Sequence, residues 1–245
     1  MNVNLAIRVD PLVLMPHAFL DTSKAWLSQL GEAHHDFAEW WAVPRGPRDA
    51  FVPFSAREQM LARLQADHNQ LSGELPGGLR DGAVDSVVLT NAGNEKDWAR
   101  RGKVALFLNF AKGQIRLRIG KVEKVYDHPG QVLWSLLATV TKGSRVRFAQ
   151  TNVQQKVGDE LLLYSIHRAP FLHREYLGWM GYVDQSVTAA QVPEAARLER
   201  QGNGTLILAT DFLDLGNPAA IKQANKVEMS LVDLDLLPVI DPSLR

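Results

Sequence analysis

The sequence contains no cysteine among its 245 residues. This absence excludes a disulfide framework, catalysis by a thiolate and zinc sites built on cysteine ligands. It leaves the compartment open, because proteins of the cytosol and of the periplasm both occur without cysteine. Any chemistry must therefore come from histidines, carboxylates and hydroxyl groups.

The N-terminal stretch MNVNLAIRVDPLVLMP lacks a basic leader, and it lacks a long apolar run. Arg8, Asp10 and Pro11 interrupt its apolar residues. Neither a secretory signal peptide nor a membrane span has this pattern. We therefore expect a cytoplasmic protein with no membrane partner.

The sequence has no excess of charge of either sign, because 27 Lys and Arg balance 27 Asp and Glu. A protein held on nucleic acid by its overall field needs a positive excess, so no direct nucleic-acid partner is expected. Basic residues nevertheless outnumber acidic ones from Lys96 to Arg147, and acidic residues gather near the C-terminus. Solvated faces of strands and helices explain such runs. A module that binds nucleic acid through the basic middle is the alternative.

The composition, 46% hydrophobic and 22% charged, is that of a folded globular protein. The length suits a single domain over residues 1–245. LAIRV, Leu5 to Val9, alternates as a strand does. Apolar spacing predicts a helix from Asp21 to about Trp41, and the Ser-x-x-Glu capping box at Ser55 predicts a second helix to about Gln70, followed by a loop over Leu71–Gly82.

The rest of the chain is rich in predicted strands, and the link Ala-Lys-Gly joins two of them as a hairpin. Helices are expected from about Val132 to Gly143, near Glu194 to Arg200, and after Asn217, which caps the first turn ahead of Pro218. This order predicts an α+β fold with a mostly antiparallel central sheet flanked by helices. The predicted strands are SVVLTN, KVALFLNF, QIRLRIG, RVRFAQ, LLLYSI, WMGYV and TLILATD.

The stretch HHDFAEWWAV, from His34 to Val43, has the residue types of a metal site. On a helix, however, adjacent residues point about 100° apart, and a zinc pair needs histidines four positions apart. We therefore expect no metal here. Trp41 is assigned to the core, and Trp40 lies at the edge of the apolar stripe, where it suits either the core or a contact.

Motifs for a catalytic nucleophile and for a phosphate-binding loop are absent from the sequence. Asp127 beside His128 precedes Pro129, so helix capping explains it as well as acid-base chemistry does. Asp211 and Asp214 lack a third ligand of matching context. We expect no enzyme and no cofactor. An enzyme of unassigned class, in which His128, His167 or His173 meets a carboxylate in a deep pocket, is the alternative.

The order of features resembles a family of immunity proteins of polymorphic toxins, number fifty-two in that classification. The resemblance is sharpest over Trp40–Trp41, the aromatic segment Gly178–Tyr182 and the close from Gly204 to Pro238. It covers most of the chain as a pattern and contains no catalytic motif.

This resemblance implies a cytoplasmic antitoxin that binds a cognate effector delivered by neighbouring bacteria, commonly through type VI secretion. The effectors of the family are nucleases of restriction-endonuclease type. Because a nuclease presents a basic cleft, acidic residues beside an aromatic anchor are the expected contacts. The candidates are Glu95, Asp97 and Trp98 in the loop NAGNEKDWARRG, together with Asp211 and Asp214.

Overall fold

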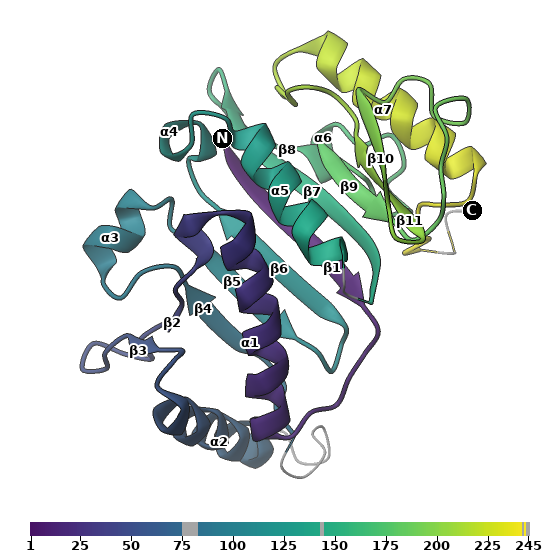
Figure 1. The fold of residues 1–245 in the computed structure, drawn as a ribbon. Helices are drawn as coiled ribbons and strands as arrows, with labels where there is room; N and C mark the ends of the chain where they lie inside the picture. Colours follow the sequence, from purple (N-terminus) through teal and green to yellow (C-terminus); the bar gives the residue numbers. More distant parts are fainter. Residues whose placement is uncertain (75–82, 143–144, 242, 244–245) are drawn as a thin grey trace. The chain divides into compact units, whose positions relative to one another are not determined.

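The computed structural model describes residues 1–74, 83–142, 145–241 and 243. Its contacts divide the chain into two compact units, and each is described by itself. Unit 1 joins Met1–Ile7 to Gly120–Arg245, and unit 2 is Arg8–Ile119. Helices and predominantly antiparallel strands occur in both units (Figure 1), which confirms the predicted α+β class. The single domain expected over residues 1–245 stays a prediction.

Unit 2 contains antiparallel strands in the order β6-β5-β4-β2-β3. The predicted hairpin is confirmed as the pair β5 and β6. Along β6 every second residue is buried, whereas Arg116 and Arg118 are exposed. The elements of this unit are α1 (Pro16–Ala33), the 3-10 turn η1 (His35–Phe37), β2 (Trp41–Ala42), β3 (Val52–Pro53), α2 (Arg57–Glu74), β4 (Val87–Thr90), α3 (Glu95–Arg100), β5 (Ala105–Asn109) and β6 (Gln114–Ile119).

The prediction of one helix from Asp21 to Trp41 is wrong at both ends. α1 begins at Pro16, and Asp21 forms an exposed ion pair with Arg57 at 2.7 Å instead of capping the helix. The helix ends at Ala33, because His34 is extended and its Nδ1 accepts a hydrogen bond from the Asp36 N–H at 3.2 Å. That bond caps the turn η1 and prevents the helix from continuing.

Of the two tryptophans after this turn, Trp40 takes the core role that was one of its two expected roles, and the core position expected for Trp41 is wrong. Trp40 is 4% exposed and donates its Nε1 hydrogen to the Phe37 carbonyl at 2.8 Å. Trp41 is partly exposed and lies in β2, where it pairs with Thr90 of β4. α2 continues to Glu74, so the loop predicted over Leu71–Gly82 is wrong for Leu71–Glu74, and residues 75–82 lie outside the described residues.

Unit 1 contains strands in the order β10-β11-β9-β7-β1, with β8 paired to β7. The helix expected near Glu194–Arg200 is wrong. Arg197–Arg200 instead belong to β10, because the turn after Gln201 folds this strand back onto β11, with Leu198 opposite Ile207, and residues 194–196 precede the strand. The strands are β1 (Asn2–Val9), β7 (Val146–Val157), β8 (Glu160–Leu163), β9 (Met180–Val183), β10 (Arg197–Gln201) and β11 (Gly204–Leu208).

Helices of unit 1 cover this sheet. β9 is buried at all four of its residues, so both of its faces are covered, and α5 (Pro129–Lys142) packs against β7, β9 and β10 (Figure 1). α7 (Pro218–Asp233) begins as predicted, because the Asn217 side chain accepts a hydrogen bond from the Ala219 N–H at 3.0 Å. Two short helices complete the unit, α4 (Val122–Val125) and α6 (Tyr164–His167). Gly143, predicted to end α5, lies outside the described residues.

In the described part of the chain, no helix combines the length and apolar character that crossing a membrane requires.

A buried carboxylate fixes α7 to the segment that leads into β9. Glu228 is 1% exposed, and its Oε1 accepts hydrogen bonds from the N–H groups of Leu177 and Gly178, both at 2.9 Å. Burial raises the pKa of Glu228 to about 7, although those two bonds and the Tyr164 hydroxyl lower it in part. The carboxyl group therefore holds its proton in the folded state to a higher pH than in the unfolded chain.

This shift makes the stability of the protein pH-dependent. Below pH 4.5 the Glu228 carboxyl is protonated in both states, and between pH 4.5 and about 7 the unfolded chain loses the proton first. The free energy of unfolding should therefore fall by about 1–3 kcal/mol as the pH rises through this window, and stay level above it. We expect Glu228→Gln to flatten this slope in urea unfolding at pH 5, 6, 7 and 8. A variant with the slope of the parent would contradict the assignment.

Candidate functional site

A groove of about 800 Å³ opens in unit 1 beside the first turn of α5. Its rim carries three carboxylates, and its walls are aromatic. The carboxylates are Glu123, Asp127 and Asp211; the aromatic residues are Tyr126, Trp134, Trp179 and Phe212. We call this the acidic groove.

Trp179 holds the two sides of the acidic groove together. It is fully buried and donates its Nε1 hydrogen to the Thr210 carbonyl at 3.0 Å. Its ring meets Phe212 edge to face, with centroids 5.3 Å apart. On the other side it packs against Gly130, where an added Cβ would lie 3.2 Å from Trp179 Cζ2. Trp179 thus fixes the loop that carries Asp211 against the start of α5.

Negative charge predominates at the rim. Glu123 is paired with the N-terminal ammonium group at 2.6 Å, whereas among the described residues neither Asp127 nor Asp211 has an ion-pair partner. The cationic Arg197 stacks on Trp134, 4.5 Å from the ring centroid, and is itself paired with Glu199 at 2.5 Å. Because Glu199 offsets Arg197, Asp127 and Asp211 leave the groove with a negative field for a cationic ligand.

The structure separates the predicted pair Asp211 and Asp214. Asp211 is exposed on the acidic groove, as a contact residue must be. Asp214 is partly buried, and its Oδ1 accepts hydrogen bonds from Gln155 Nε2 and from the Gly216 N–H, both at 2.9 Å. Asp214 therefore has a structural role in the turn before α7, and the two carboxylates do not form one site.

The predicted contacts Glu95, Asp97 and Trp98 lie in unit 2, on a short helix instead of a loop. Asn94 caps this helix, α3, by accepting a hydrogen bond from the Asp97 N–H at 2.9 Å. Asp97 also forms an ion pair with Arg100 at 2.9 Å. The hydrogen bond with the Asn94 side chain, followed by the charge of Arg100, lowers the pKa of Asp97. Trp98 donates to the Val104 carbonyl at 2.7 Å and lies under Lys103. Asp97 and Trp98 thus stabilise their own segment, and Glu95 is exposed.

His34 and His35 lie closer together than a continuous helix would place them. Possible ligand atoms of His34, His35 and Asp36 all lie within 4.8 Å of one another. The argument from helical divergence therefore fails, because the helix ends before them. His34 Nδ1 nevertheless already accepts the Asp36 N–H, and burial followed by the neighbouring His35 lowers the His34 pKa. Capping of the turn η1 accounts for the cluster.

The features behind the alternative functions are distributed over the chain. Of the three histidines considered for catalysis, His128 lines the acidic groove. His167 Nδ1 lies 3.0 Å from the backbone N–H of Leu163 within its own turn. Arg116 and Arg118 are exposed on β6.

Sequence reasoning named Asp211 but missed the groove around it, because segments far apart in the sequence supply its walls. The one local hint of this site in the sequence was that Asp127 and His128, which both line the groove, are neighbours.

Comparisons with known proteins assign this chain to no family. No family model matches this sequence, and no curated protein matches it. The structure is similar to a solved structure of a type VI secretion system (T6SS) protein from Pseudomonas aeruginosa, with 10% sequence identity and a TM-score of 0.48. The similarity covers 93% of this chain and 72% of the other. At this level it supports no inference about function.

The close packing at Gly130 gives a test of the groove's architecture. Gly130→Val should push Trp179 away and lower the free energy of unfolding by about 1–3 kcal/mol, because the side chain enters an occupied space. Gly46→Val is the matched control, since nothing lies within 4 Å of an added Cβ there, and it should change stability by less than about 0.5 kcal/mol. Urea unfolding measures both. Equal stabilities of the two variants would show that Trp179 is not held as described.

Proposed function

We propose that this protein is an immunity protein, which neutralises a cognate effector toxin by direct binding through the acidic groove. The observation that carries the proposal is the combination of exposed, unpaired carboxylates, Asp127 and Asp211, with a rigid aromatic wall. Aromatic residues on a fixed scaffold are the usual anchors of tight protein interfaces. Carboxylates around them select a basic partner and speed the encounter.

A nuclease is the class of toxin that suits this groove best. An enzyme that holds nucleic acid neutralises phosphates with Lys and Arg, so its cleft is basic. A protein that offers carboxylates to that cleft competes with the nucleic acid for the same cations. Insertion of a lysine or arginine of the toxin between Asp127 and Asp211 would therefore block the toxin without any catalytic step by the inhibitor.

The sequence pattern supports the same proposal independently of the groove. Trp40–Trp41, Gly178–Tyr182 and Gly204–Pro238 are the segments that resemble the immunity family. Two of them contribute directly to the acidic groove, through Trp179 and through Asp211 with Phe212. Since no family model matches the chain, membership of that family is part of the proposal.

Charge reversal at the groove tests the proposal. The protein is co-expressed with the effector encoded beside its gene, and growth of the host and co-purification of the two proteins are scored. Asp127→Lys combined with Asp211→Lys should weaken the complex at least about tenfold and abolish protection. The reason is that two ion pairs with cations of the toxin, which the complex would cover, become repulsive. Both residues are exposed, so the melting temperature should stay that of the parent.

A control variant separates local contact from the loss of net charge. Asp159→Lys combined with Glu160→Lys makes the same change of charge in the β7–β8 hairpin, where Asp159 lies in the turn, Glu160 begins β8 and both are exposed. This variant should still protect the host. If the parent protein neither rescues growth nor forms a complex, immunity to that effector is wrong. A titration with duplex DNA at rising salt then tests the basic strand residues of the alternative.

A further inference from the structure

The outer face of α7 carries several apolar residues where a solvent-facing helix is normally polar. The inner face, with Ala220, Ala224, Val227 and Leu231, is buried in the core of unit 1. The outer face forms one side of an open groove of about 690 Å³, which we call the α7 groove. Its apolar residues are Leu215, Pro218, Ile221 and Met229.

Residues of α7 that line the α7 groove follow a helical spacing. Pro218, Ile221, Asn225 and Met229 succeed one another at intervals of three and four residues, so they form a stripe along the helix that is apolar except for Asn225. Met229 is 52% exposed, whereas Leu215, which lines the groove beside the helix, is buried. Apolar residues exposed together on one face of a charged helix mark an interaction site more often than a single exposed residue does.

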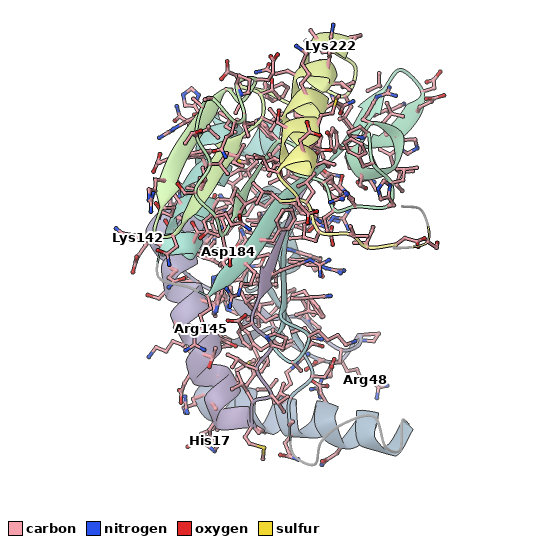
Figure 2. The ribbon with its side chains drawn as sticks, turned by 90° about the vertical axis from the view of Figure 1, so that its right-hand side faces the viewer. His17, Arg48, Lys142, Arg145, Asp184 and Lys222 are labelled. Carbon is pink, nitrogen blue, oxygen red and sulfur yellow. The ribbon has the colours of Figure 1, made fainter. Side chains whose placement is uncertain are left out.

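The charges of the α7 groove are all positive. Arg168, Lys222 and Lys226 line it, and no acidic residue does. Arg168 donates to the carbonyl groups of Leu215 and His167, which are neutral acceptors and leave its charge uncompensated. Lys226 is paired with Glu194 at 2.5 Å, whereas Lys222 extends from the outer end of α7 (Figure 2).

These charges decide between the possible occupants. A second copy that packed its own α7 groove here in a symmetric dimer would bring two surfaces together whose charged lining residues are all cationic, which is repulsive. An acidic partner is attracted by the same cations that repel a second copy. The concave groove suits the side chains of a helix better than it suits a flat lipid surface, and the stripe from Pro218 to Met229 spans about 18 Å, or about three turns of a partner helix.

We propose that the α7 groove is a docking site for an amphipathic helical segment of a partner protein whose polar face is acidic. Apolar side chains of that segment, spaced by three and four residues, would lie on Ile221 and Met229, and its carboxylates would reach Arg168 and Lys222. The site is separate from the acidic groove, and it accepts the opposite charge. It does not depend on the toxin-binding role proposed above.

The test uses a displayed library of random sixteen-residue peptides, selected on the full-length protein. The best peptide is then synthesised with a fluorescent label, and its affinity is measured by anisotropy. We expect acidic peptides with apolar residues at positions i, i+3 or i+4, and i+7. Met229→Asp and Lys222→Glu should each reduce the affinity at least tenfold. Met15→Asp is the matched control, because Met15 is an exposed methionine of unit 2 (54% exposed), and it should leave the affinity unchanged.

Several outcomes would overturn the proposal. These are a failure to enrich any peptide, an enrichment of basic peptides, or an affinity that Met229→Asp does not reduce. Binding of the parent protein to phosphatidylserine vesicles that Lys222→Glu removes, without peptide binding, would assign the groove to a lipid surface instead. The double variant at Asp127 and Asp211 should bind the selected peptide normally, so a failure of toxin binding and a failure of this proposal are distinguishable.

Discussion

The backbone at Leu177 and Gly178 is the point on which unit 1 depends. Gly178 has a positive φ of 73°, and the carbonyl oxygen of Thr151 occupies the place where a Cβ would stand. That close approach joins the long strand β7 to the start of β9 and leaves two N–H groups pointing at α7. Glu228 accepts both, since a buried N–H without a partner would cost about 1–3 kcal/mol. One glycine thus brings a strand, a helix and the following Trp179 into register.

Both grooves of unit 1 follow from this arrangement. Trp179 comes directly after Gly178 and carries the walls of the acidic groove, and Glu228 fixes α7 so that its outer stripe faces solvent. The charges of the two grooves are opposite, although the chain as a whole has none in excess. A neutral total therefore conceals two local fields, each of which selects a different kind of partner.

Local signals predicted much of the fold. The cap at Asn217, the alternation along β6 and the apolar spacing of α5 depend on neighbours in sequence, and the structure has all three. Two of the failures depend on backbone interactions that helical spacing does not register. The stretch after Ala33 has helical spacing, but His34 is extended, and Trp41 pairs with Thr90 of β4. In the expected helix near Glu194–Arg200, Leu198 and its neighbours pair with β11 as a hairpin. The candidate site was foreseen only at Asp211. The residues around it come from α4, α5, the turn before β9, β10 and β11, and no local sequence pattern indicates that segments so far apart meet.

The positions of the tryptophans have an optical consequence. Of the six tryptophans, those in unit 2 are Trp26, Trp40, Trp41 and Trp98, and unit 1 contains only Trp134 and Trp179. Both of the latter line the acidic groove, and Trp134 lies beneath the Arg197 guanidinium group. A molecule that enters the groove and displaces Arg197 changes the electric field at that indole. The contribution of Trp134 to the emission of the protein, over the contribution of the four tryptophans of unit 2, therefore reports without a label whether this groove is occupied.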